Sequence, residues 1–160
     1  MVDPNLNRHV RGPGVTVPPP VIYLAFFLAG IALGWAFPLP SFESRAALFI
    51  GWLIALASLV IAVLGFKEFR TAQTTFRPDR SASSLITTGI FKFSRNPLYL
   101  SLFLLYSGIS ILIGAWWPII LLPLLFTAMD RYVVAREERY LAQRFGASYS
   151  DYCKRVRRWL

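Results

Sequence analysis

Residues 87–99 read Thr-Thr-Gly-Ile-Phe-Lys-Phe-Ser-Arg-Asn-Pro-Leu-Tyr, and the rest of the chain is organised around this stretch. The flanking sequence is apolar, whereas here the chain is polar, aromatic and basic until an apolar run resumes at Pro97. Asn is a favoured helix N-cap, and Pro is favoured at the first helical position, where no N–H is left unpaired. We therefore expect a helix to begin at Pro97, with its free N–H groups beside Arg95 forming an anion site.

The composition is too apolar for a soluble domain of this size. Of 160 residues, 56% are hydrophobic and 16% are charged, and the apolar residues come in long blocks. Blocks of about 20 residues span the core of a bilayer. The sequence thus predicts an all-α integral membrane protein with about four transmembrane helices and a cytoplasmic C-terminal amphipathic helix. The expected spans are residues 21–37, 46–66, 97–113 and 118–134.

The boundaries between these segments carry turn and break signals. Residues 1–20 are rich in Gly and Pro and are expected to be a flexible tail, which leaves 21–160 as the membrane domain. Pro123 is expected to bend the fourth span, and Gly146 to end the helix that follows it. Gly30 and Gly34 form a GxxxG pattern, which fits close packing within the bundle or a dimer seam. The oligomeric state stays open.

The last residues repeat an apolar pattern of helical spacing. Tyr149, Tyr152, Val156 and Trp159 follow one another at steps of three and four, with basic residues between them. This pattern predicts an amphipathic helix on an anionic membrane surface. The alternative is a basic, solvent-exposed end without lipid contact.

The positive charge is distributed on one side of the predicted membrane. All Lys and Arg residues except Arg45 fall on the side of the two termini, so the positive-inside rule puts the termini and residues 87–99 in the cytoplasm. If the protein is prokaryotic, this membrane is the cytoplasmic one. The net charge of +9 is thereby explained without nucleic acid. One cysteine, Cys153, and one histidine, His9, argue against a metal site.

The predicted hairpin of the third and fourth spans brings Pro97 and Glu137 to the same membrane face. Arg95 and a helix N-terminus would then lie near two acids, Glu137 and Glu138. A positive and a negative subsite suit a zwitterionic ligand, such as the amino-acid end of S-adenosylmethionine. Alternatively, these charges are solvated surface pairs that contribute little. An acid that does not face the site is expected to pair with Arg131, Arg136 or Arg139.

The chain resembles a known superfamily over about residues 66–160. The similar residues are Leu85–Phe91, Ser94–Tyr99, Glu137 and Glu138 with Leu141, Phe145-Gly146, Tyr149 and Tyr152. In this order they look like the isoprenylcysteine carboxyl methyltransferase and phospholipid methyltransferase superfamily of membrane enzymes, in its small prokaryotic branch.

The resemblance implies S-adenosylmethionine as cofactor, bound by residues 83–99 and 131–152, and a lipophilic small molecule or lipid as acceptor. Arg95 and Glu137 are the expected catalytic residues. The expected cofactor contacts are Leu85, Ile86, Phe91, Asn96, Pro97, Leu98, Tyr99 and Glu138. Family members of the carboxyl methyltransferase type have an arginine where this chain has Val133, so Arg131 or Arg136 would have to replace it.

Two other functions stay open on the sequence alone. Sterol reductases look similar in their last helices and use a nicotinamide cofactor, although their chains are usually much longer. A small membrane protein without enzymatic activity is the other alternative. The sequence does not distinguish an amine, a carboxylate or a hydroxyl as methyl acceptor.

Overall fold

The computed structural model describes residues 14–42, 44–72 and 84–160, and these residues form helices and no strand. The elements are α1 (Pro19–Ala36), α2 (Arg45–Thr71), the 3₁₀ turn η1 (Gly89–Lys92), α3 (Pro97–Leu112), α4 (Trp116–Ile120), α5 (Leu122–Ala128), the π-helical turn η2 (Met129–Val134), α6 (Ala135–Phe145) and α7 (Ala147–Arg155). The all-helical class is as predicted. Residues 1–13 of the expected tail and most of the connection before residue 84 lie outside the described residues.

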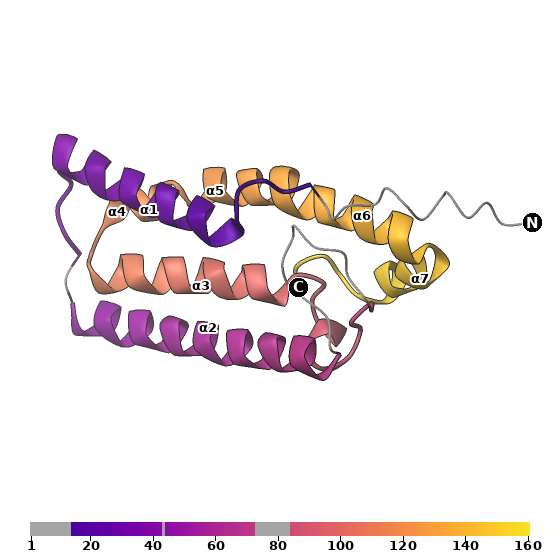
Figure 1. The fold of residues 1–160 in the computed structure, drawn as a ribbon. Helices are drawn as coiled ribbons and strands as arrows, with labels where there is room; N and C mark the ends of the chain where they lie inside the picture. Colours follow the sequence, from indigo (N-terminus) through magenta and orange to yellow (C-terminus); the bar gives the residue numbers. More distant parts are fainter. Residues whose placement is uncertain (1–13, 43, 73–83) are drawn as a thin grey trace, which may run out of the picture.

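The long helices lie side by side in a bundle (Figure 1). α3 packs along α2 on one side, while α1 and the run from α4 to α6 lie on the other. Two helices, α1 and α2, are long and apolar enough to cross a membrane, and α3 is a shorter apolar helix. The fourth predicted span is divided among α4, α5 and η2. Four complete spans therefore remain a prediction.

Local signals explain where the first helices begin. Pro19 and Pro20 occupy the first positions of α1, where proline costs no hydrogen bond. Ser44 caps α2, its hydroxyl accepting from the N–H of Ala47 at 3.0 Å. α2 has 27 residues, or about 40 Å at 1.5 Å per residue, so it is longer than the predicted span of residues 46–66 and longer than a bilayer core is thick.

The N-terminal segment before α1 is packed instead of free. Val15 is buried in the main core with Tyr23, Leu125 and Met129, and the Gly14 carbonyl accepts from Arg136 at 3.2 Å. The expectation of a flexible tail through residue 20 therefore differs from the structure over residues 14–20, where core contacts and the start of α1 order the chain.

α3 begins at Pro97, but its cap differs from the expected one. Asn96 occupies the N-cap position and makes no side-chain capping bond. Its Nδ2 instead donates to the carbonyl of Arg158 at 2.9 Å. The Asn-Pro pair marks the helix start correctly, whereas the asparagine side chain holds a distant segment of the chain.

The run after α3 contains the breaks that proline and glycine predict. The helix is interrupted at Leu121, and α5 restarts with Pro123 in its first turn. Gly146 ends α6 with a φ of 52°, a left-handed conformation that favours glycine. Both predicted features are present.

Glycines permit close approach between helices. A Cβ at Gly30 would lie 2.8 Å from Pro118 of α4, while one at Gly34 would meet only Trp117, at 3.7 Å. Gly51 and Gly108 bring α2 against α3 in the same way. The GxxxG pattern therefore includes a packing contact within the bundle, one of the two readings that the sequence left open.

The apolar face that is predicted to contact a membrane surface is covered by protein in the structure. The helix exists as α7, but Tyr149, Tyr152 and Val156 are buried against Leu85, Leu141 and Phe145. Val156 is already extended, so Trp159 lies beyond the helix. The three-and-four spacing records an apolar face, and in the structure protein covers that face instead of lipid. Lys154, Arg155 and Arg157 remain exposed.

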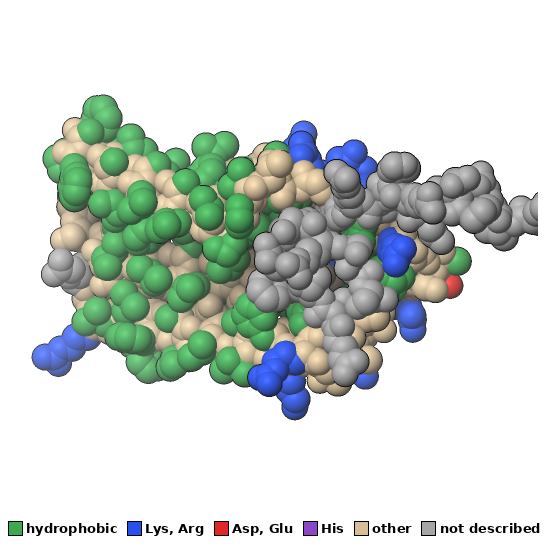
Figure 2. Space-filling view, viewed as in Figure 1, with side chains coloured by type: hydrophobic (Ala, Val, Ile, Leu, Met, Phe, Trp, Pro, Cys, Tyr) green, Lys and Arg blue, Asp and Glu red, His purple; other side chains and the backbone are tan. Residues whose placement is uncertain are grey.

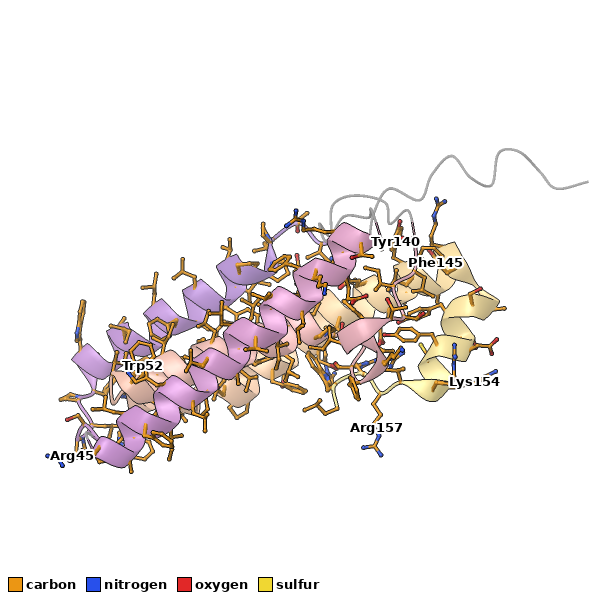
Figure 3. All side chains as sticks on the ribbon, turned by 90° about the horizontal axis from the view of Figure 1, so that it is seen from below. Arg45, Trp52, Tyr140, Phe145, Lys154 and Arg157 are labelled. Carbon is orange, nitrogen blue, oxygen red and sulfur yellow. The ribbon has the colours of Figure 1, made fainter. Side chains whose placement is uncertain are left out.

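The surface has two different ends. Apolar side chains cover α1, α2 and α3, among them Trp35 and Phe49, 85% and 71% exposed (Figure 2). Basic side chains gather at the end formed by α6 and α7, where Lys154 and Arg157 lie, while Arg45 lies at the opposite end (Figure 3). Exposed apolar side chains over so much of the surface indicate that this surface contacts lipid or another protein.

Candidate functional site

The loop before α3 is fastened to α2 and α7. The Thr88 hydroxyl donates to Oε2 of Glu68 at 2.6 Å, and the Tyr152 hydroxyl donates to the carbonyl of Phe91 at 2.7 Å. Gly89 has a φ of 54°, and a Cβ there would collide with the Glu68 carboxylate. These contacts fix the segment that carries Arg95.

A cavity of about 360 Å³ lies between the start of α1, the second half of α2 and the first half of α3. Leu59, Ala62 and Phe66 of α2 face Leu102 and Leu105 of α3 across it. Leu59 is also 60% exposed, so the cavity is open sideways to the apolar surface. The volume lies within the range of small-molecule sites.

Polar groups lie at one end of this cavity. Phe91, Arg95, Asn96 and Tyr99 line it where α3 begins, together with Glu137 of α6. Leu105 is eight residues after Pro97, the first residue of α3, and therefore about 12 Å away at 1.5 Å per residue. The cavity is therefore amphipathic, with a charged end and an apolar length.

Glu137 is held by a tyrosine. The Tyr99 hydroxyl donates to Oε2 of Glu137 at 2.8 Å, and the Tyr23 hydroxyl donates to the backbone carbonyl of Tyr99 at 3.1 Å. Burial raises the pKa of Glu137, the hydrogen bond from Tyr99 opposes this, and the charge of Glu138 raises it further. The net rise in pKa is the condition that suits a carboxylate for accepting a proton.

Glu138 lies between two guanidinium groups. Its Oε1 is 3.1 Å from Nη2 of Arg95, and its Oε2 accepts from Nη2 of Arg158 at 2.5 Å. Nη1 of Arg158 lies 3.2 Å from each carboxylate oxygen of Asp130. The hydrogen bond to Glu138, the largest cause, raises the pKa of Arg158. Positive and negative groups thus alternate from the loop before α3, with Arg95, to η2, with Asp130.

Two buried polar atoms in this network have no hydrogen-bond partner among the described residues. They are Nε of Arg95 and Oε1 of Glu138, whose ion pair lacks hydrogen-bonding geometry. Nη1 of Arg95 is directed to the sulfur of Cys153. Arg95 lines the cavity and retains an unpaired donor, so its guanidinium can bind a carboxylate there.

The structure brings most of the expected site residues together. Seven of them line the cavity: Phe91, Arg95, Asn96, Pro97, Leu98, Tyr99 and Glu137. Glu138 is not in its wall and contacts Arg95 instead. Leu85 packs on the α7 cluster, and Ile86 is buried outside the cavity wall. These last two make no contact with the cavity in the structure.

The expected partners of the acids are not the ones that the structure shows. Arg136 donates to Gly14 and lies over the ring of Tyr132, and Arg139 donates to the carbonyl of Ala135. Val133 is buried in the core. Glu138 is reached from other parts of the chain by Arg95 and by Arg158, and Arg158 was not among the predicted partners.

One sequence signal pointed toward this network. Asp130 stands within an apolar run, and an acid at such a position is normally paired. Its partners are Arg158 and Trp159, whose Nε1 donates to Oδ1 at 3.1 Å. An acid in an apolar run therefore predicts a paired cation, but it does not identify which arginine supplies the charge.

Comparison with known proteins identifies a family for most of this region. The family model described as phospholipid methyltransferase matches residues 46–148. The chain is 33% identical over 72 residues to Protein-S-isoprenylcysteine O-methyltransferase of Schizosaccharomyces pombe, covering 45% of this chain and 30% of that protein. It therefore spans less than a third of that relative. It is 38% identical over 66 residues to an uncharacterized protein of Haemophilus influenzae, covering 39% of this chain and 100% of that protein.

No solved structure matches the chain significantly. The family match covers more than half of the chain and includes α2, the loop before α3, the cavity wall on α3 and both acids of α6. These are the elements that build the charged end of the cavity. The chain belongs to the phospholipid methyltransferase family.

Proposed function

We propose that the protein is a membrane-embedded methyltransferase that moves a methyl group from S-adenosylmethionine to a lipophilic acceptor. The observation that carries this proposal is that one cavity is lined by apolar residues, such as Leu59 and Leu105, and by the charged residues Arg95 and Glu137. An apolar chain and a charged cofactor need such opposite environments within reach of each other. The family match supports the reaction class.

The proposed membrane topology uses the apolar surface. α1, α2, α3 and the run from α4 to η2 cross the bilayer, and the end formed by α6 and α7 lies in the cytoplasm. The exposed apolar side chains of α1 and α2 support this orientation, as does the grouping of Lys154 and Arg157 at the opposite end from Arg45 (Figure 3). The acceptor then enters sideways, past Leu59.

The residues at the charged end fit the amino-acid part of the cofactor. Arg95 lines the cavity, and its Nε has no hydrogen-bond partner among the described residues, which suits it to bind a carboxylate. Glu138 pairs with this guanidinium at 3.1 Å and holds it in place. Phe91 offers an aromatic wall beside them. When bound, S-adenosylmethionine supplies an electrophilic methyl group on a sulfonium. Ordered donors and acceptors of this kind fix orientation, which is most of what methyl transfer requires.

Glu137 acts on the acceptor in this proposal. It lies in the cavity wall with its carboxylate held by Tyr99, and its raised pKa favours accepting a proton from an amine or hydroxyl acceptor. Arg95 binds negative charge at the same end. The apolar walls of α2 and α3 exclude water from the reacting groups.

Calorimetry on the purified protein in detergent tests the cofactor. S-adenosylhomocysteine is expected to bind, and NADPH is not. Binding of NADPH alone would favour a reductase, and binding of neither would favour a protein without enzymatic activity. Transfer of labelled methyl into a total lipid and protein extract then identifies the acceptor class. Label recovered only in water-soluble products would contradict a lipophilic acceptor.

A further inference from the structure

Residues 156–160, here called the C-terminal strap, run across the loop that precedes α3. The N–H of Arg95 donates to the carbonyl of Arg157 at 3.1 Å. The carbonyl of Arg158 accepts from Asn96 Nδ2 at 2.9 Å and from the Ser94 hydroxyl at 3.4 Å. The strap therefore has a fixed backbone position beside the charged end of the cavity. It lies outside the segment that the family model matches.

The strap is also anchored by its tryptophan. The ring of Trp159 packs against Phe103 of α3 and Phe126 of α5, with centroids 5.8 and 5.0 Å away. Its Nε1 donates to Asp130. With the backbone bonds on one side and this ring on the other, Arg158 has little freedom, and its guanidinium is directed between Asp130 and Glu138.

Arg158 makes the one hydrogen bond that Glu138 accepts among the described residues. That bond occupies Oε2 at 2.5 Å, while Oε1 makes an ion pair with Nη2 of Arg95 at 3.1 Å. Arg95 is near Oε1 but is itself held by the strap through its backbone and by Cys153 through its side chain. The side chain of Glu138 is only 14% exposed, so its orientation is set by these arginines and not by water.

We infer that Arg158 is a positioning residue, which fixes the Glu138 carboxylate and, through the ion pair between Oε1 of Glu138 and Arg95, holds the Arg95 guanidinium at the charged end of the cavity for the carboxylate of the cofactor. This inference rests on the proposed function. Arg158 does not line the cavity, and it acts through Glu138. Its neighbour Arg157 provides a matched comparison, because it has the same charge and the same strap position, while its side chain is exposed and points away from the protein (Figure 3).

The test compares Arg158→Gln with Arg157→Gln by calorimetry with S-adenosylhomocysteine. Arg157→Gln is expected to bind like the wild type. Arg158→Gln is expected to bind at least about 10-fold more weakly, which corresponds to about 1.4 kcal/mol. Arg158→Lys should recover part of the loss, because one ammonium can reach Glu138 but does not span both carboxylates as the planar guanidinium does.

A double variant separates positioning from folding. Removing Arg158 leaves Asp130 without its cation, which lowers stability for reasons unrelated to the cofactor. Asp130→Asn combined with Arg158→Gln removes that unpaired acid, so the thermal midpoint in detergent should recover while the affinity stays low. Recovery of both quantities would show a merely structural role and overturn the inference. Equal binding by the Arg157 and Arg158 variants would also overturn it, whereas a wild type that binds no S-adenosylhomocysteine would overturn the proposed function and with it this inference.

Discussion

Replacing Ala62 with Phe should obstruct the acceptor and spare the cofactor. Ala62 lies in the α2 wall of the cavity, and the substitution adds six carbons to a space of about 360 Å³. If the new ring displaces three methylenes of the acceptor from the cavity, at roughly 0.8 kcal/mol of burial energy each, the binding free energy of the acceptor falls by about 2.4 kcal/mol. That energy corresponds to about 50-fold in the amount of acceptor needed for half-maximal transfer.

The assay measures labelled methyl transfer at increasing amounts of a total lipid extract. Val60→Phe is the control, because Val60 is on the same helix but is 56% exposed on the apolar surface. Both variants should bind S-adenosylhomocysteine like the wild type, which also verifies folding. An Ala62→Phe variant with unchanged half-saturation, or a Val60→Phe variant that is equally impaired, would refute the assignment of the cavity to the acceptor.

Three further outcomes are expected. Glu137→Gln should lose methyl transfer and still fold, and full activity would remove Glu137 from the mechanism. Its thermal midpoint should exceed that of the wild type by an amount that grows above pH 4.5, the ordinary pKa of the group. Burial raises the pKa of Glu137 above this value, so the cost of ionising it in the folded state grows with pH. Tyr99→Phe removes the hydrogen bond that lowers the pKa of Glu137, so the acidic limb of the pH–rate profile should move to higher pH, and an unmoved profile would disconnect the pair from catalysis. Gly30→Ala should destabilise the protein by about 1–3 kcal/mol, since its Cβ would lie 2.8 Å from Pro118, whereas thermal melting should find Gly34→Ala neutral or slightly stabilising; equal effects would contradict the close packing of α1 on α4.

The sequence was sufficient for features that local chemistry determines. Asn96-Pro97 marked the start of α3 because proline restricts the backbone locally, and Gly146 marked the end of α6 for the same kind of reason. The apolar blocks located α1 and α2 within a few residues. These signals depend on neighbours in the chain and need no knowledge of tertiary contacts.

Features that depend on distant pairing were not predictable. Tyr149 and Tyr152 show an apolar helical face, but the spacing is the same whether lipid or protein covers it. Arg158 was one of several basic residues near the end of the sequence, and only the fold reveals that it reaches Glu138 and Asp130. The sequence predicts Arg131 or Arg136 as the replacement for the family arginine at Val133 only because both lie nearby in the chain.

The separation of the cavity into an apolar length and a charged end has a consequence for how relatives of this protein diverge. Apolar walls distinguish chains by only about 1–3 kcal/mol per methylene, so under the proposed function Leu59, Ala62 and Phe66 select a class of acceptor tail and not one molecule. Substitutions there can change the preferred tail while Arg95 and Glu138 stay untouched, because α2 supplies the first group and the start of α3 and α6 the second. Under the proposed function, relatives can therefore acquire new acceptors through changes in one helix face and keep the proposed methyl-donor end unchanged.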